Sequence, residues 1–242
     1  MDDPLSLGGG RFALTREPGP PPAVVKTGPE APLAHEAAAL ALLAGVPGVP
    51  ALIAHSAGRL VMAEVDGAPR DLAAAGDGDL RELGRLLARV HARGVCAAAA
   101  LPWWPSPETT AAGYAARRAE GAARALADAG HPVTVAVPRC EAPFRPVHGD
   151  LVAANIVWGP APHLVDWEFW RWGDPAEDLA YLAEANGLDD ARLAAVLDGH
   201  GNPAVAGRVP GWRPVAAAET AAWWLGVGRA DLAAPLLAAL GR

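Results

Sequence analysis

The sequence predicts an α+β protein in which a small antiparallel sheet with one helix precedes a larger, mostly helical part. Three observations support this prediction. Short apolar runs separated by turns rich in Gly and Pro occupy residues 1–67. Alanine- and leucine-rich stretches make up most of residues 68–242, and residues 79–93 show helical spacing of their leucines. Two short apolar runs, residues 155–158 and 163–165, flank a Gly/Pro turn and predict a β-hairpin among the helices.

The sheet is expected in the first part of the chain. Residues 5–15 carry three consecutive glycines, Gly8, Gly9 and Gly10, between short apolar stretches. This pattern indicates a hairpin whose turn exposes backbone amides, although an ordinary turn or an unstructured N-terminus is equally compatible with it. Residues 23–26 predict a buried strand that ends in Lys26, and two further strands are expected after it. They span residues 49–55 and 59–65.

The helices are predicted from composition, spacing and end signals. The helix at residues 35–44 ends before Gly45 and carries Glu36 in its first turn, where an acid favours the helix dipole. His91, near the end of the helix at 79–93, is interpreted as a structural histidine. We expect the helix at 107–129 to face solvent with Arg117, Arg118 and Arg124 exposed. Further helices are expected from residue 174 and at 189–199 and 216–240, and residues 131–147 as an extended connection.

Composition excludes several classes of protein. The chain is 52% hydrophobic and 19% charged, as soluble globular proteins are, and no apolar run is long enough for a membrane helix. The acidic N-terminus does not resemble a signal peptide, and Cys96 and Cys140 form no spaced cluster, so we expect a cytoplasmic protein with free thiols. The net charge of −7 argues against nucleic-acid binding and permits cationic substrates. No zinc-ligand spacing is present.

The use of basic residues points to one side chain. The chain contains nineteen arginines, one lysine and no glutamine. A lysine that persists in such an arginine-rich sequence calls for a specific reason. Its compact ammonium fits beside phosphate oxygens differently from a broad, planar guanidinium. Lys26 is therefore a candidate functional residue.

The central hairpin carries polar residues at both of its ends. His148, Gly149 and Asp150 precede the first run, Asn155 follows five residues after Asp150, and Asp166 follows the second run. In phosphoryl transfer, one carboxylate orients the attacking hydroxyl and accepts its proton, while an amide oxygen and a second carboxylate bind Mg²⁺. Taken one at a time, each of these residues is also compatible with an ordinary hairpin that has acids in solvent and one amide in a turn. Their joint spacing favours the functional interpretation.

These residues resemble the catalytic and metal-binding loops of the aminoglycoside phosphotransferase / choline kinase family, which is related to protein kinases. The resemblance implies a two-lobed protein-kinase-like fold, with residues 1–67 as the nucleotide-binding lobe and 68–242 as the catalytic lobe. It also implies the site roles. Asp150 would be the catalytic base, and Asn155 and Asp166 would bind Mg²⁺. Lys26 would hold phosphates and pair with Glu36, while the glycines Gly8, Gly9 and Gly10 would cover the ATP phosphates. Backbone groups at Glu64 and Val65 would bind adenine in front of Met62.

Two more roles concern the shape of the catalytic loop. The resemblance implies that Asp178 braces the backbone of this loop. We expect His148 to shape the same loop through a hydrogen bond to the backbone near Asp166. The residues that follow Asp166 leave no room for a peptide-docking segment, which favours a small-molecule acceptor over a protein substrate.

The implied activity is transfer of the γ-phosphoryl group of ATP to a hydroxyl of a small molecule, by a monomer or homodimer without nucleic-acid or membrane partners. The acceptor would be an aminoglycoside-like or other hydroxylated antibiotic or metabolite, with a role in antibiotic resistance among the possibilities; choline, ethanolamine or thiamine is the alternative. A nucleotide-binding pseudokinase and a protein kinase are less favoured. Tryptophan faces and nearby acids could bind a cationic acceptor, whereas packing under a loop is the more expected role of any single tryptophan. The candidates are Trp103, Trp104, Trp167, Trp170, Trp172, Trp212, Glu168, Asp174, Glu177 and Asp189.

Overall fold

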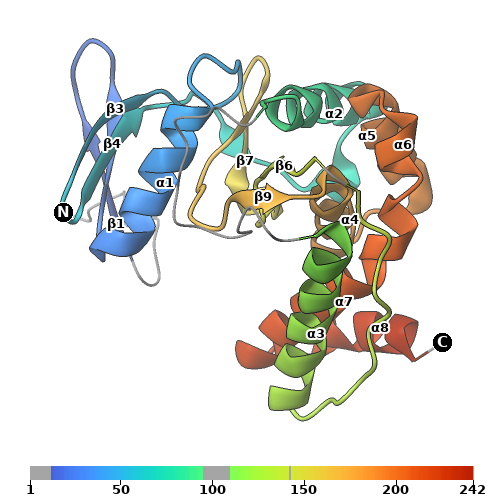
Figure 1. Cartoon of the computed structure of the whole chain (residues 1–242). Helices are drawn as coiled ribbons and strands as arrows, with labels where there is room; N and C mark the ends of the chain where they lie inside the picture. Colours follow the sequence, from blue (N-terminus) through green and yellow to red (C-terminus); the bar gives the residue numbers. More distant parts are fainter. Residues whose placement is uncertain (1–11, 95–109, 142, 242) are drawn as a thin grey trace.

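The computed structural model describes residues 12–94, 110–141 and 143–241. Figure 1 shows an antiparallel sheet with one helix at one end of the molecule and a group of helices at the other. Short strands of the central hairpin lie between these two parts. The predicted α+β organisation is therefore confirmed. Gly8, Gly9 and Gly10, like Cys96, Trp103 and Trp104, fall outside the described residues.

The N-terminal sheet has four antiparallel strands in the order β1-β2-β4-β3. They are β1 (Ala13–Glu17), β2 (Ala23–Thr27), β3 (Leu52–Ser56) and β4 (Arg59–Ala63). Lys26 on β2 lies opposite Leu14 on one side and Leu60 on the other. Helix α1 (Glu30–Leu42) packs against β3 and β4. Leu60 and Met62 of β4 belong to the main hydrophobic core, which joins the sheet to the rest of the molecule.

Helix α1 begins at Glu30, so the predicted start at residue 35 was wrong. Pro32 lies in the first turn, where the missing N–H of proline has no helical partner to lose. The longer helix places Glu36 in its middle, and Glu30 is the acid in the first turn. Glu36 is completely buried, so its position is explained by contacts across the molecule and not by the helix dipole.

The C-terminal part is built from seven helices within residues 77–94, 110–141 and 143–241 of the described chain. They are α2 (Asp77–His91), α3 (Ala111–Asp128), α4 (Pro175–Ala185), α5 (Asp190–His200), α6 (Pro203–Ala206), α7 (Val209–Gly226) and α8 (Ala230–Leu240). Helix α2 packs on α5, while α3, α4 and α8 all pack on α7. The leucines and valine that predict the α2 stripe are fully buried. None of the described helices combines the length and hydropathy that crossing a membrane requires.

Two predictions about these helices were wrong in detail. The stretch expected as one helix at 216–240 forms the end of α7 and all of α8, separated at Gly228, which has a φ of +76°. Arg117 and Arg124 on α3 are exposed as expected, but Arg118 pairs with Glu177 and Glu219. Helix α3 is therefore a packed wall of the C-terminal part and not only a solvent-facing cover.

The remaining strands position the polar loops. The predicted hairpin is confirmed as β7 (Ile156–Trp158) and β8 (Pro162–Leu164), joined on its edge by β5 (Ala68–Pro69). Strands β6 (Arg145–Val147) and β9 (Arg171–Gly173) pair antiparallel. This pairing brings the chain before His148 next to the chain after Asp166. Two 3₁₀ turns complete the described structure, Leu72–Ala74 and Ala153–Asn155.

Candidate active site

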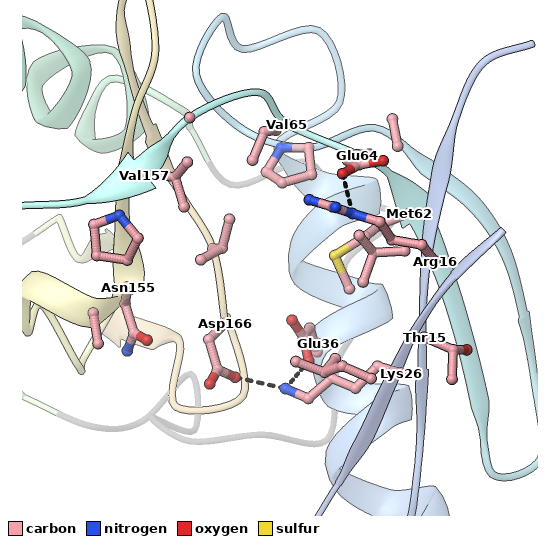
Figure 2. A pocket seen from close by; sticks show the side chains of 18 residues that line it. Thr15, Arg16, Lys26, Glu36, Met62, Glu64, Val65, Asn155, Val157 and Asp166 are labelled. Atoms are coloured by element: carbon pink, nitrogen blue, oxygen red, sulfur yellow. Dashed lines mark hydrogen bonds and ion pairs between the residues drawn. The ribbon is translucent and has the colours of Figure 1, made fainter. Parts of the chain in front are cut away.

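A cleft of about 410 Å³ lies between the N-terminal sheet and the central hairpin. Strands β1, β2 and β4 supply one wall, and the residues around β7 and β8 supply the other (Figure 2). Its polar lining consists of Thr15, Arg16, Lys26, Glu36, Glu64, Asn155 and Asp166. Five of the residues predicted from the sequence to form the nucleotide and metal sites are in this set, and Val65 lines the cleft as well.

Lys26 is held between two carboxylates. It is 4% exposed, and its Nζ lies 2.8 Å from Glu36 Oε2 and 2.6 Å from Asp166 Oδ1. The ring of Phe12 lies 4.2 Å from the same ammonium. Burial alone would lower the pKa of Lys26, but Glu36 and Asp166 outweigh burial and raise the pKa above its ordinary value. The predicted Lys26–Glu36 pair is present, and the ammonium is charged and directed into the cleft (Figure 2).

Glu36 also fixes the loop that follows the hairpin. Its Oε1 accepts a hydrogen bond from the backbone N–H of Trp167, 3.2 Å away. His35, which precedes Glu36 on α1, forms two hydrogen bonds with Trp170. Trp170 Nε1 donates to His35 O, and His35 Nε2 bonds to Trp170 O. Helix α1 is thereby tied to the chain that follows Asp166, at Trp167 and at Trp170. These bonds place the Glu36 carboxylate where it can bind Lys26.

Asp166 has an unusual backbone conformation. Its φ is +65°, the only positive value at a non-glycine position among the described residues. Such a conformation is uncommon for residues other than glycine and is often found at functional sites. The side chain is 38% exposed and points toward Lys26 from the opposite wall of the cleft (Figure 2). The carboxylate is therefore accessible to a ligand that enters the cleft.

The Asp150 carboxylate is held at both oxygens. Asn155 Nδ2 donates to Oδ2 at 2.9 Å, and the hydroxyl of Tyr181 donates to Oδ1 at 3.2 Å. Burial raises the pKa of the Asp150 carboxyl, while His148, Tyr181 and Asn155 oppose this rise. The arrangement fixes the direction of the carboxylate that the sequence predicts as a base.

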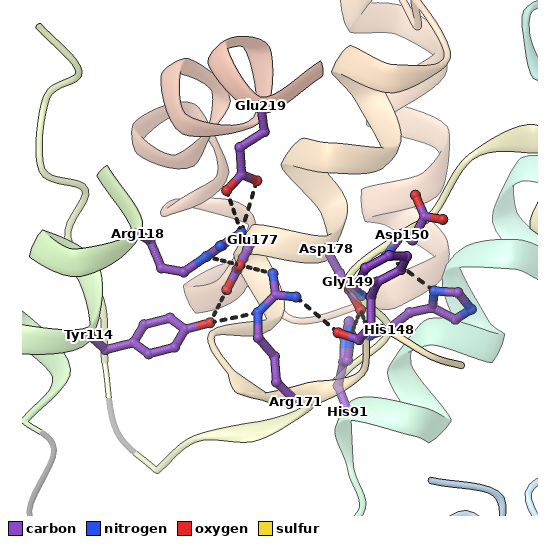
Figure 3. Close-up of polar contacts among 11 residues, drawn as sticks. His91, Tyr114, Arg118, His148, Gly149, Asp150, Arg171, Glu177, Asp178 and Glu219 are labelled. Atoms are coloured by element: carbon purple, nitrogen blue, oxygen red, sulfur yellow. Dashed lines mark hydrogen bonds and ion pairs between the residues drawn. The ribbon is translucent and has the colours of Figure 1, made fainter. Parts of the chain in front are cut away.

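Asp178 holds the backbone of the loop before Asp150. Its carboxylate accepts hydrogen bonds from the N–H groups of His148 at 2.7 Å and Gly149 at 2.9 Å, and His91 contacts it at 3.0 Å (Figure 3). Burial by itself would raise the pKa of Asp178, but the hydrogen bonds and His91 lower it below its ordinary value. His148 Nε2 bonds to the carbonyl of Val165 at 3.0 Å. The expected structural contacts of Asp178, His91 and His148 are confirmed.

Gly149 is required by the backbone of this loop. Its φ is +81°, and a Cβ at this position would lie 2.4 Å from the carbonyl oxygen of Phe169. A larger residue would meet both a strained conformation and a backbone clash. The glycine therefore lets the loop before Asp150 approach the chain that follows Asp166.

The end of the cleft formed by Glu64 and Val65, where adenine was expected, differs in one detail from expectation. The N–H of Glu64 donates to the carbonyl of Pro22 at 2.9 Å, so this group already has a partner. Within the described residues, the Glu64 carbonyl and the backbone of Val65 have no hydrogen-bond partner and both residues line the cleft. Arg16 forms a salt bridge with the Glu64 side chain across this end (Figure 2).

The chemistry of two residues fits a magnesium ion. Asn155 uses its amide nitrogen for bonds to Asp150, and no hydrogen bond to its Oδ1 is found among the described residues. This amide oxygen and the Asp166 carboxylate line the same cleft, and Mg²⁺ prefers oxygen ligands. The part of the chain that the structure describes contains no cluster of three or more His, Cys, Asp or Glu side chains able to hold a metal. A magnesium ion here would therefore need ligands from phosphates and water in addition to Asn155 and Asp166.

The described tryptophans considered for a cationic acceptor pack in the core, which is the alternative expected for any single one of them. Trp167, Trp170 and Trp212 are at most 2% exposed, and Trp172 is 8% exposed. Their faces pack in the core and cannot bind a ligand. Two of the proposed acids are also occupied, because Asp174 pairs with Arg208 and Glu177 is the partner of Arg118 and Arg171.

The structure also brings forward residues that the sequence did not single out. Tyr181 bonds to Asp150, Asn186 bonds to the backbone of the same loop, and Arg16 lines the cleft and pairs with Glu64. A signal existed for Tyr181, because residues three positions apart on a helix share a face and Asp178 was already placed beside the loop. No comparable sequence signal existed for Arg16 or Asn186.

Comparison with known proteins agrees with this geometry. The model of the family described as "Phosphotransferase enzyme family" (APH) matches residues 6–218. A comparison with curated protein sequences gave no significant match. Among solved structures, a choline/ethanolamine kinase family protein from Mesorhizobium loti is 20% identical, with a TM-score of 0.65 and coverage of 98% of this chain and 86% of that one.

Two further structures share the fold. A macrolide 2′-phosphotransferase from Brachybacterium faecium is 20% identical, with a TM-score of 0.64 and coverage of 97% of this chain and 89% of that one. An ADP-bound aminoglycoside phosphotransferase is 14% identical, with a TM-score of 0.62 and coverage of 95% and 90%. The fold is that of protein-kinase-like phosphotransferases. The chain belongs to the phosphotransferase enzyme family and is a small-molecule kinase of the type that uses ATP.

Proposed function

We propose that this phosphotransferase moves the γ-phosphoryl group of ATP to a hydroxyl of a small hydroxylated antibiotic or metabolite. The observation that supports this proposal is that three predicted side chains line one cleft and that a fourth, Asp150, bonds to one of them. Lys26 and Asp166 are in direct contact, and Asn155 lines the same cleft and bonds to Asp150. In-line phosphoryl transfer needs positioning and charge neutralisation more than covalent help from the protein, and this set supplies both.

Each residue has a distinct part in the proposed mechanism. The Lys26 ammonium binds the α- and β-phosphate oxygens while Glu36 holds it in place. The Asp150 carboxylate accepts a hydrogen bond from the acceptor hydroxyl, directs its oxygen at the γ-phosphorus and takes its proton. The new oxygen–phosphorus bond forms as the bond from the γ-phosphorus to the bridging oxygen of ADP breaks. Asn155 and Asp166 would hold Mg²⁺, which neutralises negative charge on the phosphates when bound.

The proposed division of labour follows the architecture. Residues 1–67 form the nucleotide lobe and residues 68–242 the catalytic lobe, with the connection at 64–67. Adenine is held by the Glu64 carbonyl and the Val65 backbone, with Met62 behind it on β4, where it is buried and lines the cleft. Gly8, Gly9 and Gly10 would cover the phosphates.

A small acceptor is favoured by the short path after Asp166. The chain reaches β9 at Arg171 and α4 at Pro175, and Trp167 and Trp170 of this stretch are buried. It therefore offers no extended segment on which a peptide could dock. The net charge of −7 supports acceptors that carry amines, among them choline- and ethanolamine-like molecules as the second candidate class.

The test is an ADP-release assay over a panel of aminoglycosides, macrolides, choline, ethanolamine and thiamine, with wild type and Asp150→Asn. We expect one acceptor class to be phosphorylated in a magnesium-dependent reaction. General-base catalysis typically contributes about 10²- to 10⁴-fold, so Asp150→Asn should lose activity on that scale while keeping ADP affinity. Full activity of Asp150→Asn would contradict the mechanism. Stabilisation by Mg·ATP without turnover on any acceptor would instead indicate a pseudokinase.

A further inference from the structure

Helix α4 holds the catalytic loop at several successive positions. Asp178, in its first turn, accepts the backbone N–H groups of residues 148 and 149. Tyr181, three residues later on the same face, donates its hydroxyl to the side chain of Asp150. Asn186, at the end of the helix, accepts from Ala153 N at 2.7 Å and donates to Leu151 O at 2.8 Å. The helix therefore holds both the backbone of the loop and the carboxylate of its central acid.

Tyr181 is the member of this set that touches the predicted base. Its hydroxyl and the amide of Asn155 bind different oxygens of the Asp150 carboxylate. Two donors on two oxygens fix the rotation of the carboxylate about its last bond, which a single donor would leave free. The Tyr181 side chain is half-buried on a helix whose first turn is completely enclosed, so the phenol itself is firmly placed.

We propose that Tyr181 is a positioning residue, which aims the Asp150 carboxylate at the acceptor hydroxyl. This inference rests on the proposed function, because it assumes that Asp150 meets the acceptor. A base that is aimed correctly in the resting enzyme needs no reorganisation when the acceptor arrives. The contribution of Tyr181 therefore belongs to the rate of transfer. The nucleotide contacts of Lys26, Asp166 and the 64–67 connection do not involve Tyr181.

The test uses the two tyrosines of the chain. Tyr181→Phe removes the hydroxyl that binds Asp150, while the matched variant Tyr114→Phe removes a buried hydroxyl that donates to Glu177. A hydrogen bond to a charged group corresponds to roughly tenfold or more in rate, so kcat of Tyr181→Phe should fall by about this factor. Its KM for ATP and its affinity for ADP should stay within about twofold of wild type. Tyr114→Phe should keep the wild-type kcat.

Two substitutions at position 181 keep the test decisive if the phenylalanine variant folds poorly. 4-Methylphenylalanine fills the space of the hydroxyl without donating, and p-aminophenylalanine keeps an N–H donor there. We expect the first to be as slow as Tyr181→Phe and the second to recover most of the wild-type kcat. Equal kcat values for these two enzymes, or a wild-type kcat in Tyr181→Phe, would overturn the inference while the loss of activity in Asp150→Asn keeps the proposed function. Full activity of Asp150→Asn would overturn both.

Discussion

At the scale of single residues, the site depends on one ammonium group between two carboxylates. Lys26 lies on the sheet and is almost completely buried. It contacts Glu36 of helix α1 and Asp166, which belongs to the opposite wall of the cleft. A buried charge is tolerated only when partners at close range offset the loss of water. These ion pairs explain why the charged lysine is stable where it lies, and they hold it in the position that its proposed contact with phosphate oxygens requires. Its uniqueness in an arginine-rich chain is consistent with a site that fits no guanidinium.

Lys26→Arg should therefore impair the enzyme although the charge is kept. The planar guanidinium is wider than the ammonium and must displace Glu36 or Asp166, which are 2.8 and 2.6 Å from Nζ. We expect kcat/KM for ATP to fall by roughly 10- to 100-fold, as measured by initial rates over a range of ATP concentrations. Arg59→Lys, an opposite exchange at an exposed pair with Glu17, is the control and should leave kcat/KM unchanged. Wild-type kinetics in Lys26→Arg would refute the steric argument.

Residue-scale prediction from sequence was accurate where a spaced motif named the residue and failed where only composition was available. The spacing of Asp150, Asn155 and Asp166 on a hairpin was sufficient to place them together. Arg118 was expected in solvent because an alanine-rich helix gives no sign of its partners, which lie 59 and 101 residues away along the chain. The sequence left two roles open for the tryptophans, since bulky aromatic rings near loops are compatible with either a binding face or a packed core, and the described ones are packed.

At the scale of elements, helices α2 and α5 approach each other through glycines. A Cβ on Gly84 of α2 would lie 2.1 Å from the carbonyl oxygen of Val196, and a Cβ on Gly199 of α5 would lie 2.1 Å from the carbonyl oxygen of Arg81. The backbones of the two helices therefore touch at this crossing. His91 of α2 bonds both to His200 of α5 and to Asp178, so the helix pair is linked to the residue that holds the loop before Asp150.

Gly84→Ala should destabilise the protein despite the better helix propensity of alanine. Alanine stabilises a helix interior by about 1 kcal/mol relative to glycine, whereas overpacking a tight contact costs about 1–3 kcal/mol or more. We expect a net loss of roughly 1–2 kcal/mol in the free energy of unfolding, measured by urea denaturation. The matched control is Gly121→Ala on α3, where nothing lies within 4 Å of a new Cβ. It should be stabilised, and equal effects in the two variants would argue against a tight crossing.

Element boundaries show what sequence patterns can and cannot fix. The α2 stripe and the central hairpin were predicted correctly because apolar periodicity and turn residues define them. The start of α1 was missed because Pro32 suggests a loop, although the first turn of a helix accepts proline. The division between α7 and α8 was missed because both segments are rich in alanine and leucine, and only the conformation of Gly228 marks the break.

At the scale of the whole molecule, the fold brings several histidines into surroundings that disfavour their charged form. His200 bonds to His91 through Nε2, and its Nδ1 is buried without a partner among the described residues. Burial and the neighbouring His91 lower the pKa of His200 to about 4, from an ordinary value of 6.5. Burial also lowers the pKa values of His35 and His148. Such groups couple protonation to global unfolding, because the unfolded chain exposes them to water.

This coupling predicts lower stability in mild acid. Between about pH 6.5 and pH 4 the unfolded chain binds a proton at His200 that the folded protein does not. The contribution of neutral His200 to the free energy of unfolding is therefore complete above this window and is lost as pH falls through it. The free energy of unfolding from urea titrations at about pH 7 and about pH 5 measures the loss, and we expect His200→Asn to reduce the difference between these conditions by about 1 kcal/mol. Because the substitution also changes packing, the pH dependence is the relevant quantity and not the absolute stability. His131→Asn, at an exposed position, should keep the wild-type difference. An unchanged pH dependence in His200→Asn would show that His200 binds a proton as readily in the folded protein as in the unfolded chain. The hydrogen bonds from Asp178 through His91 to His200 of α5 would then be accessible to water.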